Sequence, residues 1–123
     1  MNISAFKLTV EDMLATAKSN GTLREVYKDL ERAYSASLIS NIRDQVEGAE
    51  ILNIGSPIFM DEADAFMSGL EKLGIDSFTY SLASCDTLKH FDVFIKHGFN
   101  MKGMSELKTK FGEVKKAAVF VRA

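Results

Sequence analysis

Hydrophobic residues recur at helical spacing near the start of the chain. Thr9 with Asp12 resembles a capping box, so we expect a helix to begin there. Apolar side chains then follow at intervals of three or four residues until Asn20-Gly21, where glycine adopts a left-handed conformation at little cost and ends the helix. The apolar positions are Val10, Met13, Leu14 and Ala17.

A second helical stripe follows and is the longest in the chain. Thr22 with Glu25 again resembles a capping box, and apolar residues then keep to one face until Gly48. The pattern predicts a helix of about 25 residues. Serine side chains compete for backbone hydrogen bonds, so we expect a break in the middle of this helix. The serines there are Ser35, Ser37 and Ser40.

Beyond Gly48, segments with the period-two pattern of strands alternate with segments at helical spacing. Residues 50–54 fit a short strand or, as the alternative, an extended connection. We interpret the eight glycines as helix stops and turns. The predicted strands are 50–54, 77–81, 99–109 and 114–122, and the predicted helices are 61–73 and 86–97. The residues expected to face inward from the helix over 86–97 are Leu88, Phe91, Phe94 and Ile95.

These elements predict an α/β fold, with α+β as the alternative, in the order α-α-β-α-β-α-β-β. A β-α-β crossover makes neighbouring strands parallel, and the last two strands form a hairpin with an irregularity at Gly103. We expect two amino-terminal helices packed on one face of a small mixed sheet of three or four strands. The length of 123 residues is that of a single domain, 1–123, with a helical part over 1–48 and a β-α-β-α-β-β part over 49–123.

Charge is distributed unevenly, although the net charge is only −2. Residues 44–92 contain ten acidic and two basic residues, a net charge of −8, whereas residues 96–123 contain seven basic and two acidic residues, a net charge of +5. The basic end could mark an anionic partner, or it could be a solvated hairpin that resists edge-to-edge pairing. Nucleic-acid surfaces usually add arginine and stacking aromatics. Arg122 is the only arginine of that segment, so nucleic-acid binding is kept only as an alternative.

The compartment follows from three features of the sequence. Cys85 is the only cysteine, so no intramolecular disulfide can form, which fits a reducing environment. The amino terminus lacks the long apolar segment of a signal peptide, and no apolar run reaches the ~18 residues of a membrane span. We therefore expect a cytoplasmic protein without a membrane partner.

The junction between the second predicted strand and the helix after it is the expected position of any ligand site. Ligands of open α/β sheets bind at the carboxyl ends of strands, and the first turn of a helix offers unpaired N–H groups to an anion. The candidate ligand-binding residues are Ser81, Ser84, Cys85 and Thr87. As the alternative, Ser84 or Asp86 caps the helix, which accounts for polar residues at this junction without a ligand.

The titratable residues show no catalytic signature. A thiol at a helix start can be activated, but His90 stands on the next turn and away from Cys85, so we expect no catalytic residue. His90 and His97 lie about 10 Å apart along one helix, too far to share a metal, and we interpret both as polar-face histidines. We expect no metal and no cofactor. The carboxylates that begin the helix over 61–73 favour its dipole; they are Asp61, Glu62 and Asp64.

Three segments follow the pattern of a strand with Phe-Thr, a serine-rich turn, a helix ended by glycine, and a closing strand. They are Ser77–Ser84, His97-Gly98 and Ala117–Val121. In this pattern, roughly residues 58–122 resemble an uncharacterised small α/β domain family of phages and Gram-positive bacteria. The resemblance implies an accessory or mobile-element role with no known activity.

Gly98-Phe99 follows a helix and precedes a pair of strands. In this respect the chain resembles the carboxyl-terminal half of GNAT acetyltransferases, which implies an acyl-CoA-related enzyme or its remnant. The chain lacks the Gln/Arg-x-x-Gly-x-Gly/Ala loop that holds the coenzyme A pyrophosphate in that family. We therefore carry over no catalytic residue.

These observations favour a small non-catalytic binding or interaction protein, bacterial or phage, of accessory or mobile-element type. We do not expect an enzyme. The long amphipathic helix favours a homodimer, and the identity of any other protein partner stays open. One alternative is a small-ligand binder or acyl-CoA-related enzyme remnant that uses the Ser81–Thr87 turn. The other is weak nucleic-acid binding by the basic hairpin.

Overall fold

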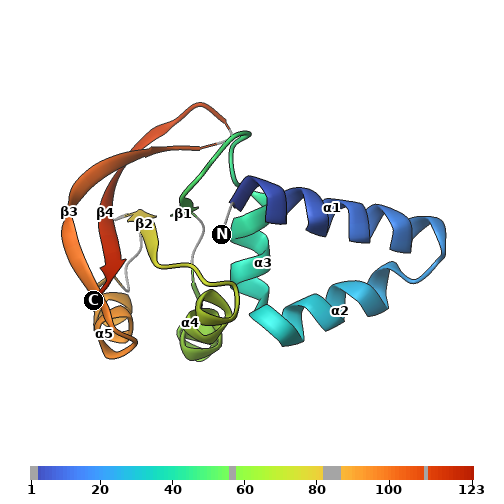
Figure 1. The fold of residues 1–123 in the computed structure, drawn as a ribbon, viewed down its shortest axis with the longest axis horizontal. Helices are drawn as coiled ribbons and strands as arrows, with labels where there is room; N and C mark the ends of the chain where they lie inside the picture. The colour runs from blue at the N-terminus through green and yellow to red at the C-terminus, as the bar shows by residue number, and fades with distance from the viewer. Residues whose placement is uncertain (1–2, 56–57, 82–86, 110) are drawn as a thin grey trace.

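A computed structural model of the protein describes residues 3–55, 58–81, 87–109 and 111–123. A mixed sheet with the strand order β1-β2-β4-β3 is covered on one face by α4 and α5, and the other helices extend from the β1 side (Figure 1). The α/β class and the mixed sheet are as predicted. The elements are α1 (Ile3–Ser19), α2 (Leu23–Tyr34), α3 (Ala36–Arg43), β1 (Leu52–Ile54), the 3₁₀ turn η1 (Met60–Glu62), α4 (Ala63–Lys72), β2 (Ser77–Ser81), α5 (Thr87–Lys96), β3 (Phe99–Lys108) and β4 (Val114–Arg122).

The two predicted capping boxes are wrong. Helix α1 begins six residues before Thr9, because Ile3 extends the apolar stripe toward the amino terminus and is buried. Thr9 therefore lies inside the helix, where its Oγ1 donates a hydrogen bond to the carbonyl oxygen of Ala5 (3.1 Å). Thr22 does precede α2, but its Oγ1 donates to the carbonyl oxygen of Ala17 (3.4 Å) and does not cap the helix.

The long predicted helix is divided at Ser35, which confirms the expected break. Ser35 has φ 78° and ψ 150°, a strained conformation for a residue with a Cβ, and it separates α2 from α3. Its Oγ accepts a hydrogen bond from the N–H of Leu38 (3.1 Å) and so caps α3. The carboxylate of Glu62 completes the cap by accepting from Ala36 N and Ser37 Oγ, each at 3.1 Å. Glu62, expected to favour the dipole of the helix over 61–73, thus caps a different helix.

Helices α1 and α2 form a helical arm, residues 3–34, which extends away from the sheet (Figure 1). The arm lies beside the sheet, not on one of its faces as predicted, and α4 and α5 cover that face instead. Arg43 of α3 contacts both helices of the arm. Its Nε donates a hydrogen bond to Glu11 Oε1 in α1 (3.1 Å), and its guanidinium lies 5.7 Å from the centre of the Tyr27 ring in α2. The hydrogen bond to Glu11 raises the pKa of Arg43. Among the helices that the structure describes, none has both the length and the apolar character needed to cross a membrane.

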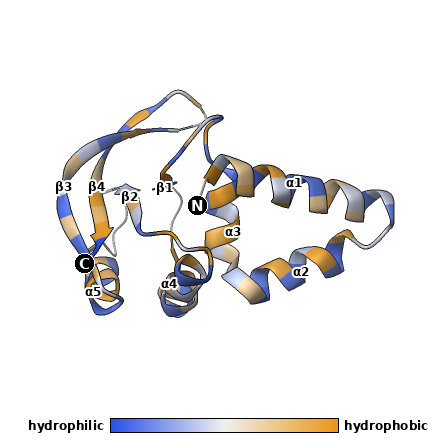
Figure 2. Cartoon of the chain, in the orientation of Figure 1, coloured by the Kyte–Doolittle hydropathy of each residue, from blue (hydrophilic) through white to orange (hydrophobic). Residues whose placement is uncertain are grey.

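The sheet follows the predicted pattern of strands. The predicted strand over 50–54 forms only over Leu52–Ile54, and this strand, β1, pairs parallel with β2 in a register that places Leu52 opposite Phe78. Strand β4 pairs antiparallel with both β2 and β3, and a register shift between Met101 and Gly103 confirms the predicted irregularity. Figure 2 shows hydrophobic residues at the end of β4 beside α5, where Phe120 enters the core.

Helix α5 is rotated about its axis relative to the prediction. Phe94 is buried as predicted, but Leu88 and Ile95 are 82% and 58% exposed. His90 takes an inward position instead and is 1% exposed. The Tyr80 hydroxyl lies 2.5 Å from its Nδ1, and burial of a polar ring requires such a partner. The interpretation of His90 as a polar-face histidine is therefore wrong.

The interpretation of every glycine as a stop or a turn is wrong for Gly69. Gly69 is buried inside α4, where the helix crosses the junction of α2 and α3. A Cβ at this position would lie 2.5 Å from Leu38 Cδ2 and 2.7 Å from the carbonyl oxygen of Tyr34. Only a residue without a side chain permits this close approach of the two helices.

Candidate functional site

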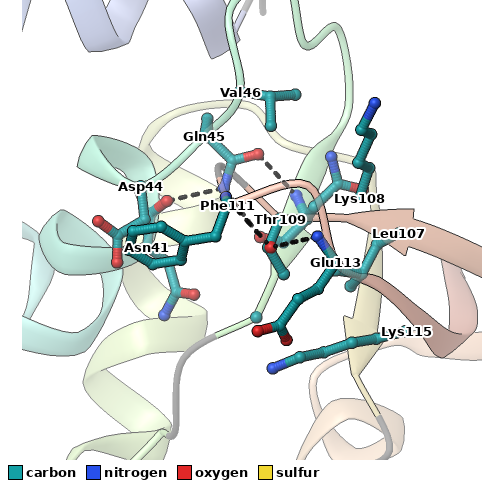
Figure 3. A pocket seen from close by; sticks show the side chains of 12 residues that line it. Asn41, Asp44, Gln45, Val46, Leu107, Lys108, Thr109, Phe111, Glu113 and Lys115 are labelled. Atoms are coloured by element: carbon teal, nitrogen blue, oxygen red, sulfur yellow. Dashed lines mark hydrogen bonds between the residues drawn. The ribbon is translucent and has the colours of Figure 1, made fainter.

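A cavity of about 320 Å³ lies at the carboxyl end of β1, where the β3–β4 hairpin curves back toward α3 (Figures 1 and 3). This volume is near the lower limit for small-molecule sites, which measure roughly 300–1,000 Å³. One wall comes from α3 and the residues after it, the floor from β1 and the residue after it, and the other wall from the hairpin. The α3 wall holds Asn41, Asp44, Gln45 and Val46, and the floor holds Asn53 and Gly55. The hairpin wall holds Leu107, Lys108, Thr109, Phe111, Glu113 and Lys115.

Gln45 fixes the α3 wall to the floor of the cavity. Its Oε1 accepts a hydrogen bond from Asn53 N (2.9 Å), and its Nε2 donates to Asn53 O (2.8 Å). The same Nε2 donates to the carbonyl oxygen of Asn41 (2.7 Å). The buried amide of Gln45 therefore takes the place of a neighbouring strand at the outer edge of β1. Asn53 is fixed further by Thr79 of β2, whose hydroxyl donates to Asn53 Oδ1 (2.5 Å).

Thr109 organises the hairpin wall. Its Oγ1 accepts hydrogen bonds from the N–H groups of Phe111 (3.3 Å) and Glu113 (3.2 Å), and its own N–H donates to Glu113 O (2.8 Å). Leu107 is buried and joins this wall to the floor, because its Cδ1 lies 3.9 Å from the position of a Cβ at Gly55. Phe111 at the tip is 80% exposed.

The cavity brings together charges from the two oppositely charged parts of the sequence. Its described lining holds two carboxylates and two ammonium groups, so the formal charge is zero. Asp44 on the α3 wall and Lys115 on the hairpin wall are half-buried, whereas Lys108 and Glu113 are exposed. Figure 3 shows Asp44 and Lys115 on opposite sides of the cavity. A half-buried charge is screened less by salt than an exposed one.

The predicted ligand-binding residues do not form this cavity. Ser81 ends β2 as predicted and lies opposite Ala117 of β4. Its side chain is buried, and its Oγ makes no hydrogen bond within the part of the chain that the structure describes. Thr87 is the first residue of α5. Ser81 does not line the cavity, and Ser84 and Cys85 lie outside the described residues.

The other depressions formed by the described residues lack the cavity's combination of buried amides and half-buried charges. His97 pairs with Asp64, with Nε2 and Oδ1 2.9 Å apart. Within residues 3–55, 58–81, 87–109 and 111–123, no group of three or more His, Cys, Asp or Glu side chains could hold a metal ion. Two depressions on the helical arm, of about 500 and 570 Å³, are lined mainly by exposed residues, and so they are open surface grooves.

The residues that line the cavity form no sequence motif, so the position of the cavity could not be predicted from the sequence. The two walls are far apart in the sequence and meet only because the hairpin curves over β1. One signal was present: Asn41 and Gln45 are four residues apart, in a segment whose neighbours Leu38 and Ile42 are apolar. Asn41 lies on the mostly buried helix α3 and Gln45 shortly after it, and buried amides need polar partners.

Comparison with known proteins places the chain in a family. No curated protein and no solved structure matches it. A family model matches residues 32–119, which is 88 of the 123 residues and well over half of the chain. The matched span contains every residue that lines the cavity and leaves out α1 and most of α2. The chain therefore belongs to the family described as a domain of unknown function (DUF7698), which confirms the expectation of an uncharacterised domain family.

Proposed function

We propose that this protein is a non-catalytic binding protein and that its ligand is a small polar molecule held between α3 and the hairpin. The supporting observation is that the cavity combines buried amides with half-buried charges of both signs from opposite walls. Small-molecule sites commonly combine apolar lining with a few convergent polar groups. Val46, Leu107 and Phe111 supply the apolar part here.

The chemistry of the lining favours binding over catalysis. The lining residues that the structure describes include no histidine, cysteine or serine, the side chains that most often act as bases or nucleophiles. The hydroxyl of Thr109 accepts two backbone hydrogen bonds within the hairpin. The remaining polar groups are amides, carboxylates and ammonium groups suited to holding a polar ligand.

Nuclear magnetic resonance titration tests the proposal. Free amino acids, carboxylates, amines, polyols and inorganic phosphate would each be added at millimolar concentration to ¹⁵N-labelled protein. We expect at least one compound to shift the side-chain NH₂ signals of Asn41, Gln45 and Asn53, since these amides line the cavity. Shifts confined to the helical arm, or no saturable shift with any compound, would overturn the proposal.

A pair of neighbouring variants supplies the control. Val46 lines the cavity and is half-buried, whereas the adjacent Glu47 is exposed and does not line it. Val46→Trp places a large ring at the cavity and should abolish the shifts. Glu47→Trp should leave them unchanged. Equal effects of the two substitutions would place the binding elsewhere.

We further propose that the protein has an accessory or mobile-element role in the cytoplasm of a bacterium or phage host, and that it forms a homodimer. The apolar face of α2 that motivated the dimer packs within the chain, with Leu30 buried and Val26 and Tyr27 against the same cluster. A dimer would therefore use another surface. Sedimentation that shows only monomer over a wide concentration range would remove this part of the proposal.

A further inference from the structure

The cavity presents opposite charges from opposite walls, and this arrangement limits the chemistry of its ligand. Asp44 follows the last turn of α3, and Lys115 lies on β4, so each comes from a different wall. Both side chains are half-buried. A ligand between them would meet a carboxylate on one side and an ammonium group on the other.

From this geometry, and on the basis of the proposed function, we infer that the ligand is a small zwitterion, of which a free α-amino acid is the simplest. Its ammonium group would be held by the Asp44 carboxylate and its carboxylate by the Lys115 ammonium group. Charge-assisted hydrogen bonds of this kind are roughly twice as strong as neutral ones. The exposed pair Lys108 and Glu113 adds no net charge at the rim.

The described lining carries no net formal charge, because Asp44 and Glu113 balance Lys108 and Lys115, and a zwitterion is likewise neutral overall. The apolar side chains Val46 and Leu107, together with the Phe111 ring, favour an aliphatic side chain on the ligand. The cavity volume of about 320 Å³ limits the ligand to the size of a single amino acid or slightly more.

Three compounds that share the branched aliphatic chain of leucine separate the two charge contacts. L-Leucine carries both charges, 4-methylpentanoate carries only the carboxylate, and 3-methylbutylamine carries only the ammonium group. Calorimetric titration of the full chain should show the tightest binding for L-leucine, with each single-charge analogue about tenfold weaker or more. Equal or tighter binding of either analogue would overturn the inference.

Two substitutions then assign each charge to its wall. Asp44→Asn should weaken L-leucine binding about tenfold and leave 4-methylpentanoate unaffected. Lys115→Gln should weaken L-leucine to a similar extent and leave 3-methylbutylamine unaffected. The matched controls are Glu47→Gln and Lys116→Gln, because both residues are exposed neighbours that do not line the cavity. Controls as damaging as the cavity variants would contradict the assignment.

Failure of this inference can be told apart from failure of the proposed function. If neither L-leucine nor its analogues bind but a polyol or phosphate shifts the Asn41, Gln45 and Asn53 amide signals, the cavity is a ligand site and the zwitterion inference is wrong. If no compound shifts those amides, both are wrong. Binding of L-leucine that Val46→Trp does not affect would place the amino acid outside the cavity and would also overturn the inference.

Discussion

The helical arm and the sheet layer, the latter made of β1–β4 with α4 and α5, differ in how their apolar residues are buried. The main core cluster of the sheet layer includes five phenylalanines that are at most 1% exposed: Phe66, Phe78, Phe94, Phe99 and Phe120. The buried cluster of the arm contains Val10, Leu14 and Leu30, with Ile39 from α3. Aromatic rings around this smaller cluster are only partly buried.

The two regions should therefore differ in stability. Local opening costs least where few apolar contacts are buried, so the arm should open before the sheet layer does. Helix α3 lies between them, with Ile39 in the arm cluster and Leu38 in the main core. The family model covers α3 and most of the sheet layer, which is the region with the larger core.

The largest effect is expected from Phe78→Ala. The Phe78 ring lies 4.9 Å from that of Phe94, 5.0 Å from Phe99 and 5.4 Å from Phe120, measured between centroids. Its removal should lower the free energy of unfolding by about 3–5 kcal/mol, and both regions should unfold together in urea. The exposed Phe111→Ala is the control, with an expected change within about 0.5 kcal/mol. A loss of less than about 1 kcal/mol at Phe78 would contradict this description of the core.

The second largest effect is expected from Gly69→Ala, at the contact between α4 and the α2–α3 junction. Alanine in a helix usually gains about 1 kcal/mol over glycine. Here the new Cβ would lie 2.7 Å from the Tyr34 carbonyl oxygen, which cannot move without its helix, so we expect a net loss of about 2–3 kcal/mol. Thermal unfolding measures this loss. At Gly103 a Cβ would meet no described atom within 4 Å, so Gly103→Ala should lower the free energy of unfolding much less. A G69A protein more stable than the native chain would refute the close contact.

Local patterns in the sequence predicted the sheet layer well. Alternation over Ser77–Ser81 and Val114–Arg122 predicted two strands, and both form over those same residues. Burial does not alternate in β2, because Thr79 and Ser81 are buried as well as Phe78 and Tyr80. Helix faces were harder to predict. Leu88 and Ile95 are apolar and seven residues apart, yet they face outward, because the Tyr80 hydroxyl makes the inward position favourable for His90.

The candidate site depends on contacts between distant segments, and local patterns do not report these. The hairpin could be predicted, but its curvature toward α3 could not. The side chain of Gln45 bonds the backbone N–H and carbonyl oxygen of Asn53, eight residues away and across a turn. Hydrogen bonds to backbone groups leave no side-chain motif in the sequence. The predicted position for a ligand is the carboxyl end of β2, whereas the cavity lies at the carboxyl end of β1.

A smaller and more local effect is expected from Leu14→Ala. Leu14 is 6% exposed and belongs to the four-residue cluster of the arm. We expect the free energy of opening the arm to fall by about 2 kcal/mol, because the cavity left behind can partly collapse between two helices. Hydrogen exchange should then quicken at the amides of α1 and α2 and stay slow in β2 and β4. Equal acceleration in all four elements would show that the two regions open as one unit.

The smallest effect is expected from Gln45→Met, at the joint between α3 and β1. Methionine keeps the length of the side chain but removes the hydrogen bonds to Asn53 N and Asn53 O. Water from the adjoining cavity can bond these groups in its place, so the loss should be about 1 kcal/mol. The outer edge of β1 would then be open to another strand, and light scattering should detect concentration-dependent association beyond that of the native chain. If Q45M neither loses stability nor associates, the amide of Gln45 does not protect this edge.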